Sequence, residues 1–227
     1  MFAGLEASNA QSIVYVVDAS GSLISTLPVV KRELERSLRH LSPEQRFAVI
    51  FFQRNQALEA TEAVVRGVSP GGNDNDRSAP AGLQTAKPEI IGRVLTWASS
   101  LRPSGRSSPL AALERGLALR PDVIFLLSTD ITGSGDFEIG RDELLRTLES
   151  LNPLNATTGR RSTRIQCIQF LDPDPLETLR RIAETHSGAG GDRSTGGSSG
   201  FRFLSREELG LNTAEPAPSS SSASGGG

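Results

Sequence analysis

Apolar residues along this chain follow two spacings that alternate with each other. Three short continuous apolar runs, at residues 13–17, 47–52 and 123–127, are typical of strands buried on both faces of a parallel sheet. The stretches between and after them carry apolar residues at helical spacing, as residues 27–41 do. This alternation predicts an α/β domain whose sheet is covered by helices on both faces.

The same patterns place the remaining elements. We expect strands at residues 13–17, 47–52, 123–127, 164–171 and 201–204, and helices at residues 27–41, 88–101, 110–119, 138–151 and 175–186. A weaker stretch at residues 58–68 is expected to supply a short edge strand. The count of expected strands is therefore six.

Composition divides the chain into three parts. Residues 1–9 are expected to form an N-terminal linker, and residues 10–206 one domain. Residues 207–227 are expected to be a disordered tail, since most of them form a low-complexity stretch that cannot bury a core. A chain of 227 residues suffices for a single α/β domain. The start of the chain is typical of a linker entering a domain, which leaves open that the sequence belongs to a longer chain.

Charge and hydropathy argue against two classes of partner, nucleic acid and the membrane interior. The formal net charge is −2, and no block of Lys or Arg provides an electrostatic footprint for nucleic acid. No apolar stretch approaches the roughly 18 residues needed to cross a membrane, and the N-terminus lacks a signal-peptide pattern. We therefore expect no nucleic-acid partner and no membrane insertion by this segment; the compartment stays open.

The first apolar run ends in a polar motif. Asp18, Ser20 and Ser22 alternate with Ala19 and Gly21 directly after it. A loop leaving a strand can turn three such side chains toward one point, and their oxygens are the ligand type that Mg²⁺ prefers. The simpler alternative is that Ser20 or Ser22 caps the following helix. Taken alone, the motif leaves both interpretations open.

A second apolar run ends in similar residues. Ser128, Thr129 and Asp130 follow residues 123–127. In open parallel sheets, ligands bind beyond the carboxyl ends of the strands, where the strand order reverses. A polar turn at residues 103–110 opens the next expected helix and can bring one more hydroxyl. Together, these segments predict an oxygen-lined site at one edge of the sheet.

These motifs resemble the von Willebrand factor type A (VWA) domain. Its metal-ion-dependent adhesion site has the pattern Asp-x-Ser-x-Ser, then a Thr, then an Asp. The first element is complete in the segment from Asp18 to Ser22, and Asp130 matches the last element, with Ile131 in place of the family's usual Gly. The Thr position corresponds to Ser108, which keeps the hydroxyl oxygen.

The resemblance covers residues 10–206 and implies both a fold and a site. The implied fold is Rossmann-like and doubly wound, with a mostly parallel six-stranded sheet, helices on both faces and one short antiparallel edge strand. The implied ion is Mg²⁺, with Mn²⁺ or Ca²⁺ as alternatives, and a protein partner's Asp or Glu completes its coordination. The implied metal-site residues are Asp18, Ser20, Ser22, Ser108 and Asp130. Neutral hydroxyl ligands leave a cation under-neutralised, so an incoming carboxylate gains attraction that water cannot match.

Two other functions stay open. The same acids can serve a metal-dependent hydrolase, but the sequence offers no positioned general base and no Gly-x-Ser-x-Gly nucleophile turn, so we expect a binding module rather than an enzyme. The departures at Ser108 and Ile131 are also compatible with a VWA-fold module whose site is vestigial. Asp136 and Glu138 are expected to cap or start a helix, with a role in partner specificity as the alternative.

Overall fold

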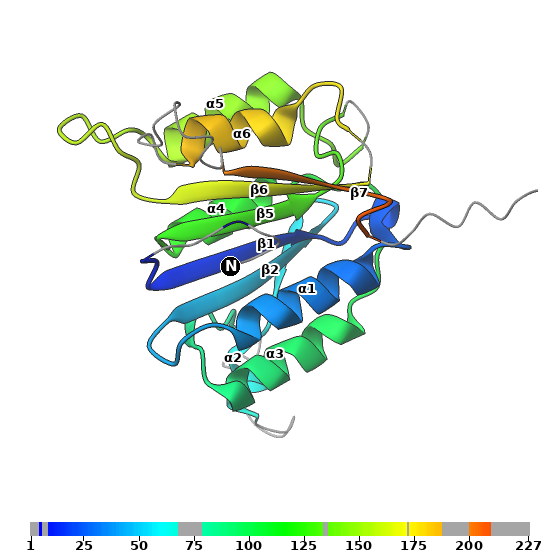
Figure 1. The fold of residues 1–227 in the computed structure, drawn as a ribbon, viewed down its shortest axis with the longest axis vertical. Helices are drawn as coiled ribbons and strands as arrows, with labels where there is room; N and C mark the ends of the chain where they lie inside the picture. The colour runs from blue at the N-terminus through cyan, green and yellow to red at the C-terminus, as the bar shows by residue number, and fades with distance from the viewer. Residues whose placement is uncertain are drawn as a thin grey trace, which may run out of the picture.

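A mostly parallel sheet runs through the computed structural model, and helices cover both of its faces (Figure 1). The structure describes residue 5 and residues 9–67, 79–133, 136–171, 173–187 and 200–209. Most of the expected linker (1–9) and tail (207–227) lies outside these described residues. None of the described helices combines the length and the apolar character needed to cross a membrane.

The sheet has seven strands within the described residues, six of them in the order β3-β2-β1-β5-β6-β7. Strands β1, β2, β5, β6 and β7 are parallel, whereas β3 and the two-residue β4 both pair antiparallel with β2. The strands are β1 (Ser12–Asp18), β2 (Arg46–Gln53), β3 (Gln56–Glu59), β4 (Gln84–Thr85), β5 (Val123–Ser128), β6 (Arg164–Leu171) and β7 (Phe201–Ser205). The predicted fold class, with its antiparallel edge strand, is confirmed.

The helices form two layers, one on each face of the sheet. They are α1 (Leu27–Arg39), α2 (Glu62–Arg66), α3 (Pro88–Ser100), α4 (Leu110–Ala118), α5 (Arg141–Leu151) and α6 (Thr178–His186), with a short 3₁₀ turn at Gly21–Leu23. Helices α1, α2 and α3 bury their apolar residues in the core on one face. Helices α4, α5 and α6 do so in the core on the other face.

Strand β1 shows why its sequence is a continuous apolar run. Tyr15 and Val17 lie in the core under α1 and α3, whereas Val14 and Val16 lie in the core under α4, α5 and α6. All four side chains are fully buried. A strand covered on both faces has no solvent side, so it cannot alternate apolar and polar residues.

The structure corrects the expected edge strand at residues 58–68. The strand β3 begins earlier and ends at Glu59, and the rest of the stretch forms helix α2. Thr61 accepts the backbone N–H of Val64 through its hydroxyl, and Gly67 ends the helix in the left-handed conformation. These two caps at opposite ends stabilise a helix where the apolar pattern alone indicated a strand.

The strand order reverses at β1, which lies between β2 and β5. The chain leaves β1 toward α1 on one face and leaves β5 toward α5 on the other. Since these two connections diverge, a crevice forms beyond the carboxyl ends of β1 and β5. This is the edge at which the sequence placed its two polar motifs.

Candidate functional site

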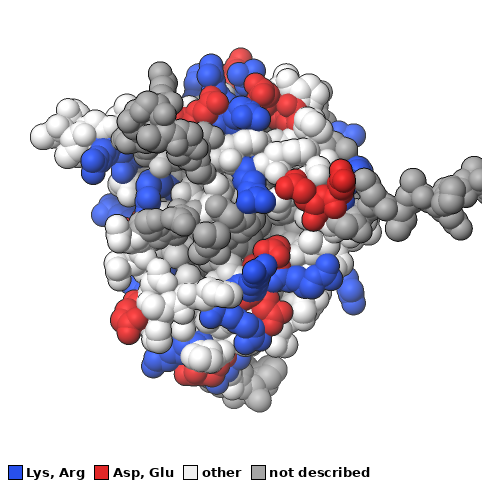
Figure 2. Space-filling view, viewed as in Figure 1, with Lys and Arg blue, Asp and Glu red and all other residues white. Residues whose placement is uncertain are grey.

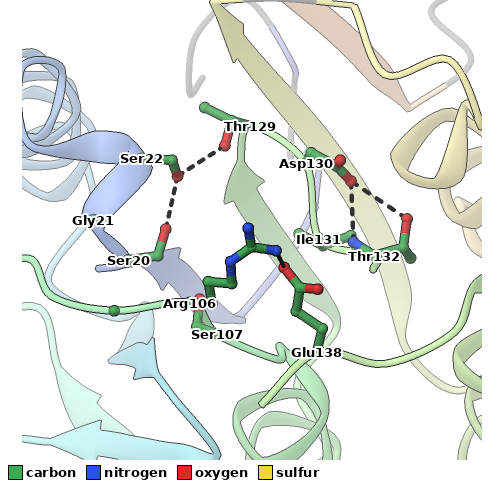
Figure 3. A pocket seen from close by; sticks show the side chains of 11 residues that line it. Ser20, Gly21, Ser22, Arg106, Ser107, Thr129, Asp130, Ile131, Thr132 and Glu138 are labelled. Atoms are coloured by element: carbon green, nitrogen blue, oxygen red, sulfur yellow. Dashed lines mark hydrogen bonds and ion pairs between the residues drawn. The ribbon is translucent and has the colours of Figure 1, made fainter. Parts of the chain in front are cut away.

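A pocket of about 460 Å³ opens beyond the carboxyl ends of β1 and β5 (Figure 3). Three loops line it: the loop after β1, the loop before α4 and the loop after β5. Its polar lining side chains include Ser20, Ser22, Ser107, Thr129, Asp130 and Glu138. The pocket therefore combines hydroxyl and carboxylate oxygens from segments far apart in the sequence.

Asp18 lies beneath the pocket and is only 1% exposed. Its Oδ1 accepts the backbone N–H of Ser20 at 2.7 Å and the hydroxyl of Ser107 at 3.3 Å, and its Oδ2 accepts the hydroxyl of Ser128. Burial raises the pKa of this carboxyl, while these hydrogen bonds act in the opposite direction. Asp18 thus joins the loop after β1, the loop before α4 and the end of β5 from below, and a nearby cation would favour its charged form.

Three hydroxyl groups converge above Asp18. Ser20 Oγ and Ser22 Oγ lie 2.8 Å apart, and Ser22 Oγ lies 3.2 Å from Thr129 Oγ1. Figure 3 shows these side chains turned toward one another across the gap between the β1 and β5 loops. Thr129 was part of the polar motif in the sequence but was not among the expected ligands.

Backbone contacts hold the first two loops together. The N–H of Gly21 donates to the carbonyl of Gly105 at 2.8 Å, and the N–H of Ser104 donates to the carbonyl of Ala19 at 3.1 Å. A Cβ atom at residue 21 would lie 3.3 Å from the Gly105 oxygen, which is tighter than ordinary packing. Glycine at this position therefore allows the two backbones to approach closely.

The structure places Ser107, rather than the expected Ser108, in the pocket. Residue 107 forms a parallel bridge with Arg54, so adjacent side chains point in opposite directions. The hydroxyl of Ser108 instead accepts the backbone N–H of Leu110 at 3.3 Å, at the start of α4. Ser108 thus has a capping contact, and the hydroxyl near Asp18 belongs to its neighbour.

Asp130 lines the pocket, and its Oδ1 is hydrogen-bonded within its own loop. Its Oδ1 accepts the backbone N–H of Thr132 at 3.0 Å and the hydroxyl of Thr132 at 3.3 Å. Figure 3 shows Asp130 across the pocket from Ser20. The next residue, Ile131, is 2% exposed and packs in the core with α4, α5 and α6, which accounts for an apolar residue where the VWA motif usually has a glycine.

An ion pair at the pocket was not anticipated from the sequence. Arg106 Nη1 donates to Glu138 Oε1 at 2.7 Å, and the guanidinium points into the space between the hydroxyl cluster and the Asp130 loop (Figure 3). The pair joins the loop before α4 to the loop before α5. The one signal for Arg106 in the sequence is its place in the polar turn, directly before Ser107.

The donor set fits a hard cation. Among the described residues, no group of three or more His, Cys, Asp or Glu forms a metal cluster, so a soft or nitrogen-preferring ion has no ligand set here. Hydroxyl oxygens with one or two carboxylates suit Mg²⁺, which retains several water ligands. The oxygens that hydrogen bonds bring together belong to Asp18, Ser20, Ser22, Ser107 and Thr129, and Asp130 lines the same pocket from its other side.

Comparison with known proteins shows the fold. No family model matches the sequence, and no curated protein matches it. Among solved structures, the chain is similar to a von Willebrand factor type A protein from Catenulispora acidiphila, with a TM-score of 0.56 and 17% identity over 78% of this chain and 37% of that one. It is also similar to the pilus adhesin SpaC from Lactobacillus rhamnosus GG, with a TM-score of 0.52 and 13% identity over 90% of this chain and 29% of that one. The protein therefore has a VWA fold and spans well under half the length of either chain.

Proposed function

We propose that the protein is a binding module that recognises an acidic residue of a protein partner through a divalent cation held in this pocket. The observation that carries the proposal is the convergence of the Ser20, Ser22 and Thr129 hydroxyls at the carboxyl ends of β1 and β5. The VWA fold supports it, as does the likeness to a chain whose name is that of a pilus adhesin.

The cation of this proposal is Mg²⁺, with Mn²⁺ or Ca²⁺ as alternatives. Ser20, Ser22 and Thr129 would hold it, with Asp130 and Ser107 within the same lining. Asp18 positions the Ser20 and Ser107 loops through its hydrogen bonds. When bound, the ion supplies a concentrated positive charge that the neutral hydroxyl groups do not cancel.

The lining favours binding over catalysis. A general base must be within hydrogen-bond reach of the proton that it removes. Of the two carboxylates that line the pocket, Glu138 pairs with Arg106, and Asp130 lies across the pocket from Ser20 with its Oδ1 accepting from Thr132. We therefore propose a binding function and no reaction.

The thermal midpoint of unfolding tests the metal site, because a ligand that binds only the native state raises it by mass action. The full chain is compared in EDTA and in millimolar Mg²⁺, Mn²⁺ or Ca²⁺. Ser22→Ala removes the hydroxyl that contacts both Ser20 and Thr129, and Ser99→Ala removes an exposed helical hydroxyl as a matched control. We expect a metal-dependent rise for the wild type and for Ser99→Ala, and a smaller one for Ser22→Ala. Equal midpoints in EDTA and in all three metals would favour a vestigial site instead.

A further inference from the structure

The ion pair at the pocket is asymmetric in its exposure. The Arg106 side chain is 71% exposed, whereas the Glu138 side chain is 15% exposed. The carboxylate is thus held in the wall, and the Arg106 side chain extends toward it from the loop before α4 (Figure 3). This is the arrangement of a positioned arginine rather than of a surface pair whose members are equally free to move.

The wall also contains a place for the Glu138 carboxylate. A Cβ atom built on Gly133 would lie 2.1 Å from Glu138 Oε2 and 2.4 Å from its Cδ, so only glycine leaves room for the carboxylate here. The N–H of Gly133 also donates to the carbonyl of Ile139, the residue after Glu138, at 3.2 Å. The position of Glu138, and through it that of Arg106, is therefore built into the β5–α5 loop.

From this geometry we infer that Arg106 is a specificity-determining residue that binds the partner's acidic side chain directly. The inference rests on the proposed function and names a second recognition contact in the same pocket. A guanidinium has five N–H donors in a planar fork that matches a carboxylate, and the recorded bond to Glu138 uses only Nη1. Because the Arg106 side chain is 71% exposed, a second carboxylate that enters the open pocket can reach its other N–H groups.

The acids in the lining select a carboxylate over a phosphate group. Asp130 and Glu138 both line the pocket, and a dianion meets more repulsion from them than a singly charged carboxylate does. The hydroxyls of Ser20, Ser22 and Thr129 lie on the far side of Arg106 from Glu138 and can donate to the same ligand (Figure 3). The ligand class that fits is the side chain of an Asp or Glu in a protein.

Glu138 then acts as an internal competitor for the arginine. It neutralises Arg106 in the free protein, which limits repulsion between the guanidinium and a metal ion in the same pocket. A partner carboxylate shares or displaces this contact. Removing the charge of Glu138 should therefore strengthen binding of an acidic ligand when no metal is present.

The test is a titration of the ¹⁵N-labelled full chain with the peptide acetyl-Gly-Asp-Gly-amide, followed at the backbone amides of Gly21 and Gly105, which line the pocket. Each titration is run in EDTA and in Mg²⁺, with the Asn peptide and inorganic phosphate as control ligands. Arg106→Ala is compared with Arg36→Ala, since Arg36 is 73% exposed, pairs with Glu33 on α1 and does not line the pocket. Glu138→Gln is the third variant.

We expect Arg106→Ala to weaken binding of the Asp peptide by about tenfold, as loss of a charged hydrogen bond does. We expect Arg36→Ala to match the wild type and Glu138→Gln to bind severalfold more tightly in EDTA. Equal affinities of wild type and Arg106→Ala, no response of the wild type to the Asp peptide, or tighter binding of phosphate would overturn the inference. Unchanged or weaker binding by Glu138→Gln in EDTA would refute the competition between Glu138 and the ligand for Arg106.

The two metal conditions separate this inference from the proposed function. If Mg²⁺ raises the affinity of the wild type for the Asp peptide and Arg106→Ala has the same affinities, the metal site is supported and the role of Arg106 is refuted. If Arg106→Ala weakens binding but Mg²⁺ has no effect on the wild type, Arg106 recognises the acid and metal dependence is refuted.

Discussion

Ser22 Oγ and Thr129 Oγ1 lie 3.2 Å apart although the two residues are separated by 107 positions in the sequence. Each stands just beyond the end of a central strand, β1 for Ser22 and β5 for Thr129. These strands are hydrogen-bonded neighbours, with Val17 opposite Leu127. The sheet register therefore brings the two polar motifs together, and any ligand of one motif also meets the other.

Asp18 should be important for stability even without metal. Replacing it by Ala leaves the Ser128 hydroxyl and the Ser20 N–H without their buried acceptor. We expect the free energy of unfolding to fall by about 1 to 3 kcal/mol, because the lost hydrogen bonds outweigh the cost of burying the carboxyl, which raises its pKa. Urea unfolding in EDTA measures this loss, with Asp130→Ala as the control because Asp130 is exposed. Equal losses for the two variants would contradict the role assigned to Asp18.

Gly133→Ala should disturb the pocket more than the fold. The new methyl group would overlap the Glu138 carboxylate, which can swing away and release Arg106. We expect a loss of less than about 1 kcal/mol, since the pair is partly exposed, together with shifted amide signals at Gly105. Gly140→Ala is the matched control because nothing lies within 4 Å of its built Cβ. A large loss of stability for Gly133→Ala but not for Gly140→Ala would show that the Glu138 carboxylate cannot move away from the new methyl group.

The buried His186 should make stability depend on pH. Burial and the positive charge of Arg161 lower its pKa to about 4, with Glu149 acting in the opposite direction. An unfolded chain binds the proton near pH 6.5, so this group costs no stability at neutral pH and an increasing amount as the pH falls from 6.5 toward 4. We expect a loss of roughly 2 to 3 kcal/mol over that range.

Urea unfolding at pH 7.5 and pH 4.5 measures this dependence. His186→Gln should flatten the profile, because Gln carries no proton yet can still accept a hydrogen bond from Asn152, which lies 3.3 Å from His186 Nδ1. His40→Gln serves as the control, since the ring of His40 lies at the surface. A wild type and a His186→Gln variant with parallel profiles would refute the assignment.

The ion pairs of Glu59 and Glu62 should differ in their contribution to the free energy of unfolding. Glu59 is 6% exposed at its side chain and accepts from Arg115 Nε at 2.9 Å and from the N–H of Gly82, so it joins β3 to α4. We expect Glu59→Ala to lower the free energy of unfolding by about 1 to 3 kcal/mol. The exposed pair of Glu62 and Arg66 should contribute less than about 0.5 kcal/mol, as Glu62→Ala would show. Similar losses for the two variants would contradict the claim that the buried pair stabilises the fold more than the exposed pair does.

Buried strands were the most predictable part of the fold. The expected strand at residues 123–127 falls within β5, because a strand covered on both faces leaves a continuous apolar run with clear limits. The stretch at residues 58–68 was less predictable. Its outcome depends on two caps, at Thr61 and Gly67, which compete with a weak apolar pattern.

The candidate site was predictable in its place but not in its details. Residues within one motif, such as Ser20 and Ser22, keep a spacing that the sequence displays. The choice between Ser107 and Ser108 depends on which side of the chain faces the pocket, and a one-residue change of register reverses it. The pairing of Arg106 with Glu138 joins two loops 32 positions apart and leaves no local pattern.

The most direct test of the account is a crystal structure of the protein grown or soaked with Mn²⁺, with anomalous scattering used to locate the ion. The account predicts a single strong anomalous peak in the pocket, bonded to the hydroxyl oxygens of Ser20 and Ser22. Crystals with the pocket open to solvent but no peak there at millimolar Mn²⁺, or a peak elsewhere only, would contradict the metal site on which the proposed function rests.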